Sequence, residues 1–87
     1  MGQFSSPDEQ EIFCKVAKVI NQKGHLEISA ILKFIGSKNH KKDKKYILKF
    51  IKLALIEKHR SNTYELSRIG RLIACQDCEW FKKRYKK

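Results

Sequence analysis

The chain has 87 residues, of which 41% are hydrophobic, and its formal net charge at pH 7 is +11. The hydrophobic content is too high for a disordered tail, and the length suits one small domain spanning residues 1–87. No apolar run approaches the roughly 18 residues of a membrane span, and no signal peptide opens the chain. We therefore expect a soluble, cytoplasmic protein without a membrane partner.

The positive charge is concentrated in two blocks. Residues 1–37 carry four lysines and four acids, whereas residues 38–60 carry nine basic residues against two acids. Residues 61–79 sum to −1, and residues 80–87 add +5. Two basic blocks on a neutral body predict a surface for a polyanion, because Lys and Arg neutralise phosphates and release their counterions. The alternative is a lysine-rich surface of the thermophile kind, but such surfaces usually add Glu alongside Lys.

The first third of the chain predicts two helices. Ser6 is a capping residue followed by Pro7 and, three residues after the cap, by Glu9, which together predict a helix over 7–22. Gly24 suits the exit from that helix. Residues 25–27 are too few to classify and could be a brief extended piece. Apolar residues at helical spacing then predict a second helix over 28–35, closed by Gly36.

The central basic block predicts a third helix, over 43–55, after a polar segment 37–42 that is a loop or a frayed helix start. If the helix begins early, five lysines fall within a sector of about 80°; they are Lys38, Lys41, Lys45, Lys49 and Lys52. Apolar residues, Leu48 among them, occupy the rest of the circumference. The lysine stripe contains no acids for i,i+4 pairing, so it is the best candidate for insertion into a nucleic-acid groove.

Residues 56–60 and 63–66 alternate as paired strands do. Asn62 tolerates the positive φ that a tight hairpin turn requires. Ser67 can cap a last helix, in which apolar contacts are expected. The residues expected to supply them are Ile69, Leu72, Ile73 and Trp80. Residues 1–5 are expected to form a flexible N-terminus, and residues 82–87 a basic tail.

Two segments of the chain form a familiar pair, namely Ala54-Leu55-Ile56 and Tyr64-Glu65-Leu66-Ser67-Arg68-Ile69-Gly70-Arg71. Together they resemble the second half of winged helix-turn-helix transcription regulators of the MarR, ArsR and PadR kind. The lysine- and isoleucine-rich chain is also similar to regulators from archaea and their viruses, which would place it in a host cytoplasm if viral. The resemblance implies an α+β, mainly α fold: a three-helix core, a short β-hairpin wing and a C-terminal helix. It also implies binding of double-stranded DNA, sequence-specific or architectural, by a homodimer formed through the last helix.

The residues expected to contact DNA belong to the third helix, the segment before it and the wing. They are Lys38, Asn39, Lys41, Lys42, Lys45, Lys49, Lys52, Lys58 and Arg60. Asn39 could equally be a helix cap. A stripe of lysines favours affinity over base discrimination, because Lys is a point charge rather than a planar fork. RNA or ribosome binding, and a basic adaptor for an acidic protein or membrane, are the alternatives.

No catalytic constellation, phosphate loop or cofactor motif occurs in the sequence, so we expect neither an enzyme nor a bound cofactor or metal. Cys75 and Cys78 have the spacing of a zinc half-site or a redox pair, but no second paired motif completes a zinc site. Ordinary half-buried thiols, or an inter-chain disulfide across a dimer of last helices, are the other interpretations. The opening Met1–Ser6 also fits a minimal myristoylation pattern.

Overall fold

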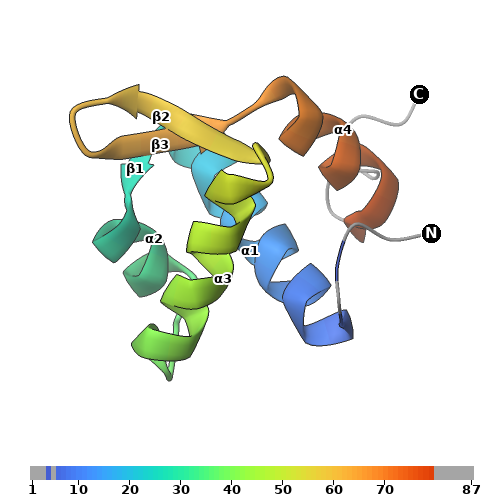
Figure 1. The fold of residues 1–87 in the computed structure, drawn as a ribbon, viewed down its shortest axis with the longest axis horizontal. Helices are drawn as coiled ribbons and strands as arrows, with labels where there is room; N and C mark the ends of the chain where they lie inside the picture. Colours follow the sequence, from blue (N-terminus) through green and yellow to red (C-terminus); the bar gives the residue numbers. More distant parts are fainter. Residues whose placement is uncertain (1–3, 5, 80–87) are drawn as a thin grey trace.

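The computed structural model describes residue 4 and residues 6–79, and these residues form the four helices and three strands labelled in Figure 1. In chain order they are α1 (Pro7–Lys23), β1 (Leu26–Glu27), α2 (Ile28–Phe34), α3 (His40–Lys52), β2 (Ile56–Arg60), β3 (Thr63–Leu66) and α4 (Arg68–Asp77). The predicted α+β, mainly helical class is confirmed. The expectations for Trp80, for the tail 82–87 and for most of the N-terminal segment 1–5 lie outside the described residues.

The strands form one antiparallel sheet in the order β1–β3–β2. β3 is central, with Tyr64 opposite Leu26 on one side and Leu66 opposite Ile56 on the other. The predicted hairpin is therefore present, and the unclassified segment after α1 supplies a third, very short strand. This strand ties the start of α2 to the hairpin.

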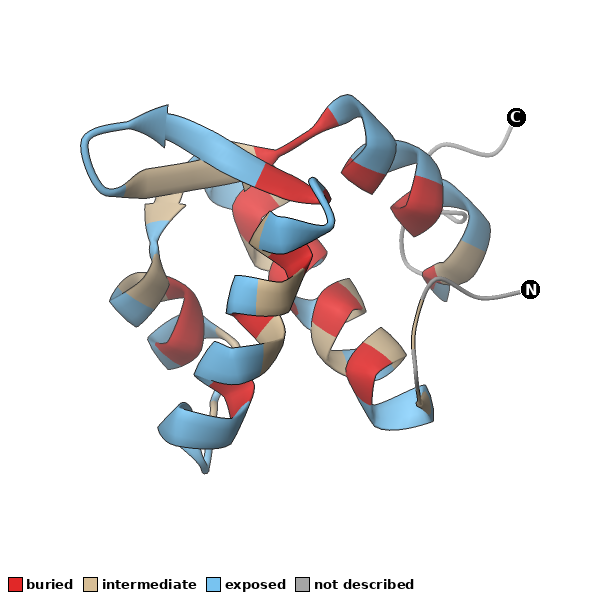
Figure 2. Cartoon of the chain, viewed as in Figure 1, coloured by how far each residue is buried: buried red, intermediate tan, exposed pale blue. Residues whose placement is uncertain are grey.

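The core lies where α1 and α3 cross beneath the sheet, and α1 also contacts α2 and α4 (Figure 2). Phe13 of α1 and Phe50 of α3 are fully buried, with ring centroids 5.3 Å apart in an edge-to-face arrangement. Ile20, Ile31 and Ile47 fill the space around them. Burial of each such side chain contributes about 2 kcal/mol, so these contacts fix how α3 sits on the domain.

α3 differs from its predicted bounds at both ends. It begins at His40 because the side chain of Asn39 accepts a hydrogen bond from the backbone N–H of Lys42, at 3.1 Å. It ends at Lys52, since Ala54 adopts a φ of 62° and its N–H bonds back to the Ile51 carbonyl. This left-handed ending is usually made by glycine, which explains why the sequence predicted a helix running on to residue 55.

The hairpin turn is also made differently from the prediction. Ser61, rather than Asn62, has the positive φ, of 43°. The register shifts between Lys58 and Arg60, so that Arg60 lies opposite Thr63. The hydroxyl of Thr63 donates to the Arg60 carbonyl at 2.8 Å, which closes the turn and leaves the neighbouring Asn62 without the role predicted for it.

The junction between the hairpin and α4 has a close backbone contact. Ser67 caps α4 by accepting from the N–H of Gly70 at 2.9 Å, and its hydroxyl lies 3.0 Å from the Leu55 carbonyl oxygen. A Cβ on Gly70 would lie 2.0 Å from that same oxygen. Ser67 caps α4 as predicted, and Ser67 and Gly70 together pack the start of α4 against Leu55, in the segment that joins α3 to β2.

A disulfide within the chain joins Cys14 of α1 to Cys78, just after α4. It corrects the possible inter-chain disulfide at Cys78, and it leaves Cys78 unavailable for the zinc or redox pair with Cys75 that the spacing also allowed. The Cα atoms of Cys14 and Cys78 are 5.5 Å apart although 64 positions separate them in sequence. Cys75 points away and is an exposed free thiol. Among the described helices, none has the length and apolar character needed to cross a membrane.

Candidate nucleic-acid interface

The outward face of α3 is a band of cations around one apolar side chain. We call it the lysine face, and its exposed members are Lys41, Lys44, Lys45, Leu48 and Lys52. The opposite side of α3 is buried through Asp43, Ile47 and Phe50. Lys44 and Leu48 were not among the predicted contacts. Leu48 was expected on the apolar side of the helix. Leu48 is in fact 47% exposed.

Lys49 stands at the edge of the lysine face and points toward α1. Its ammonium group lies 3.0 Å from the carboxylate of Glu9, which is only 3% exposed. The predicted stripe placed Lys49 among the outward lysines, but its charge is already neutralised by this acid. Lys49 therefore belongs to the α1–α3 contact, and the lysine face is better represented by Lys44.

The segment before α3 contributes exposed charge and a helix cap. Lys38 and Lys42, two of the residues predicted to contact DNA, are exposed. Asn39 is the cap of α3, so its side-chain oxygen is already occupied by a backbone N–H. Asp43, the acid in the first turn of α3, is buried and accepts from the Ser37 hydroxyl at 2.6 Å. The lysine face is consequently free of acids.

The hairpin carries charges of both signs. Lys58 and Arg60, the two hairpin residues predicted to contact DNA, are exposed. Glu57 lies opposite Glu65 on the neighbouring strand, and Glu65 is 3.3 Å from Nδ1 of His59. These acids weaken the hairpin as a phosphate-binding surface relative to α3.

The ring of His59 also stacks on that of His25, with centroids 4.2 Å apart. His25 precedes β1, so the stack joins the hairpin to the segment that follows α1. In the part of the chain described here, no group of three His, Cys, Asp or Glu side chains is placed to hold a metal ion.

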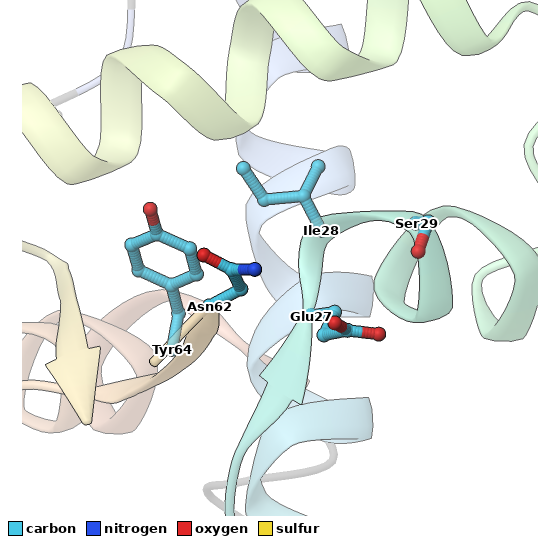
Figure 3. Close-up of a pocket in the computed structure, with 5 residues that line it drawn as sticks. All are labelled: Glu27, Ile28, Ser29, Asn62 and Tyr64. Atoms are coloured by element: carbon cyan, nitrogen blue, oxygen red, sulfur yellow. The ribbon is translucent and has the colours of Figure 1, made fainter. Parts of the chain in front are cut away.

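A small cavity of about 250 Å³ lies between the start of α2 and the tip of the hairpin (Figure 3). Asn62 and Tyr64 project from the hairpin on one side, and Ile28 faces them from the other. Glu27 and Ser29 complete the lining. This volume is below that of most sites for small organic ligands, and the Glu27 carboxylate disfavours a phosphate there.

Comparisons of the chain with protein-family models, with curated proteins and with solved structures found no match.

Proposed function

We propose that the protein is a winged helix-turn-helix protein that binds duplex DNA and regulates transcription. The order of elements supports this: three helices interrupted by a short strand, then a hairpin whose second strand lies in the middle of the sheet. α2 packs against α3, as the two helices of a helix-turn-helix do. In this arrangement α3 is the recognition helix, and the hairpin is the wing.

The observation that most supports DNA as the partner is the lysine face of α3. Four lysines are exposed on one side of a rigid helix, and the acid of that helix is buried on the other side. A major groove about 12 Å wide admits an α-helix. Long lysine side chains can then reach the phosphates on both groove edges while the helix axis lies between them.

A two-fold dimer through α4 accounts for a second exposed surface. Gly70, Ile73 and Ala74 of α4 are buried against the domain, whereas Ile69 and Leu72 on its outer side are 51% and 59% exposed. Apolar side chains this exposed on one helix face are typical of an interaction site. Pairing of α4 with its copy would bury them and present two α3 helices to successive major grooves.

The deciding experiment is a titration of the protein with duplex DNA and with RNA of equal length over a range of salt concentrations. Log–log slopes give the number of phosphates contacted, at about 0.9 per phosphate for duplex DNA. The triple variant Lys44→Ala, Lys45→Ala, Lys52→Ala should lose most duplex affinity. Its slope should fall by about 2.7 for each bound protomer if all three lysines contact phosphates.

The matched control is Lys18→Ala, Lys23→Ala, Lys33→Ala, which removes the same charge from exposed positions of α1 and α2. This variant should bind duplex with nearly the slope of the unmodified protein. Equal binding of RNA and duplex, or equal losses in the two triple variants, would contradict the proposal. Retention by an acidic protein or by anionic vesicles, without duplex binding, would favour the adaptor alternative.

A further inference from the structure

Leu48 is a large apolar side chain exposed among lysines on α3. It is 47% exposed and belongs neither to the buried core nor to the partly buried side chains packed against it. Among the described residues of α3 it is the most exposed large hydrophobic side chain. Leu48 therefore contributes little to the core and is available to a partner outside the domain.

The lysines around Leu48 indicate where that partner lies. Successive helical residues are rotated by about 100°, which places Leu48 between the directions of Lys44 and Lys45. Lys41 and Lys52 lie on the same side, toward the two ends of α3. In a groove, the long lysine side chains would reach outward to phosphates on either edge, and the shorter Leu48 would meet the floor.

We propose that Leu48 reads thymine, through contact with the 5-methyl group that thymine presents in the major groove. This inference rests on the proposed duplex binding by α3. The thymine methyl is the apolar feature among the base edges of the major groove, and apolar side chains recognise it. A hydrocarbon side chain has no donor or acceptor for the other groups on the floor, so it favours thymine over cytosine at the position it faces.

The same contact would separate DNA from RNA. Uracil lacks the 5-methyl group, and the major groove of an RNA helix is too deep and narrow for side chains to read. Leu48 thus adds the base discrimination that a set of lysines, acting as point charges, does not provide. A lone leucine among lysines would bury little apolar area in a lipid surface, which makes a membrane the weaker occupant.

The experiment begins by selecting preferred duplexes from a random library with the unmodified protein. Each thymine of the selected site is then replaced in turn by uracil, which removes a single methyl group. We expect affinity to fall about fourfold at one position in each half-site, the effect of one buried methyl group. Leu48→Ala should bind the thymine and uracil duplexes equally, and Leu48→Met should retain the difference. Leu53→Ala is the matched control, because Leu53 is 41% exposed but lies beyond the lysine face, at the end of α3.

Three results would overturn the inference while leaving duplex binding intact. They are a selected site without thymine, indifference to every uracil, and an unchanged uracil effect in Leu48→Ala. Absence of duplex binding by the unmodified protein would instead remove the proposed function and this inference together. If Leu48→Ala then weakened binding to vesicles containing anionic lipid, the leucine would be assigned to a membrane surface. If Leu48→Ala unfolds at the same temperature as the unmodified protein, its fold is retained.

Discussion

At the scale of single residues, Gly70 has the least room for a side chain among the described glycines. The carbonyl oxygen of Leu55 lies 2.0 Å from where its Cβ would be, so Gly70→Ala forces α4 away from the segment that joins α3 to β2. We expect a loss of about 3 kcal/mol in the free energy of unfolding, as overpacking of a tight contact costs, measured by urea denaturation. Gly36→Ala is the control, since Gly36 has a φ of 70° but open space around it. It should cost only about 1 kcal/mol, the strain of an L side chain in the left-handed conformation, and equal losses in both variants would contradict the packing argument.

Residues with a familiar local signal were predicted correctly. Ser6 and Ser67 cap their helices, and Gly36 ends α2 with a positive φ, because these roles depend on neighbours within a few positions. Ala54 and Ser61 have left-handed backbone conformations, which their residue types do not predict. The end of α3 and the residue that makes the turn were therefore misassigned.

At the scale of elements, the contact between α1 and α3 depends on the pair Glu9–Lys49. Lys49→Met leaves the buried Glu9 without this cation, and we expect unfolding free energy to fall by about 1 kcal/mol. The loss is modest because the Lys49 side chain is 39% exposed and solvent screens its charge. Denaturation of Lys49→Met measures this loss of unfolding free energy. Lys45→Met is the control, since Lys45 is exposed on the lysine face.

The two variants should behave oppositely. Lys49→Met should be less stable with nearly unchanged duplex affinity, whereas Lys45→Met should be stable and bind duplex less tightly. Adding Glu9→Gln to Lys49→Met should recover most of the lost stability, because a neutral side chain replaces the buried carboxylate. If Lys49→Met weakens duplex binding as much as Lys45→Met does, Lys49 acts on DNA after all.

The elements themselves could be predicted because helical and strand periodicity are local. Four helices and the hairpin were expected close to where they lie. The outward face of α3 could be predicted only in part. Helical spacing placed Lys45 and Lys52 correctly, but it cannot reveal that Lys49 meets an acid 40 positions away. Nor can it reveal that Leu48 is left outside the core.

At the scale of the whole molecule, the disulfide Cys14–Cys78 closes a loop of 64 positions and holds the end of α4 on α1. Chain entropy predicts a stabilisation of about 4 kcal/mol for such a loop. We expect Cys14→Ser to lower the unfolding temperature, and a reductant to lower that of the unmodified protein similarly. Cys75→Ser, the control, should change neither. Alkylation of the oxidised protein should modify one thiol; three modified thiols without a reductant would exclude the bond.

The pairing of Cys14 with Cys78 could not be predicted from spacing. The short interval between Cys75 and Cys78 suggested a local pair, but these cysteines lie on different sides of α4: Cys78 is 1% exposed, and Cys75 faces outward. Only the packing of α4 along α1 brings Cys14 into range. This arrangement leaves Cys75 on the outer side of α4, three positions after Leu72.

The outer side of α4 leads to the last prediction, which concerns the assembly. If two copies pair through α4, Leu72→Lys places a charge in the middle of the contact and should convert the dimer to a monomer, as measured by analytical ultracentrifugation. Phe34→Lys is the control, because Phe34 is 50% exposed on α2, far from α4 in sequence. This variant should leave the mass unchanged.

The same substitution should separate assembly from DNA contact. Leu72→Lys leaves the lysine face intact, so it should still bind one half-site but lose the gain in affinity that a second half-site gives a dimer. Under mild oxidation the unmodified dimer could be cross-linked through Cys75, since Cys78 is already bonded to Cys14. Cys75→Ser would prevent this. An unmodified protein that is monomeric at concentrations where it saturates a two-half-site duplex would rule out α4 as a dimer surface, and the exposed Leu72 would then need another partner.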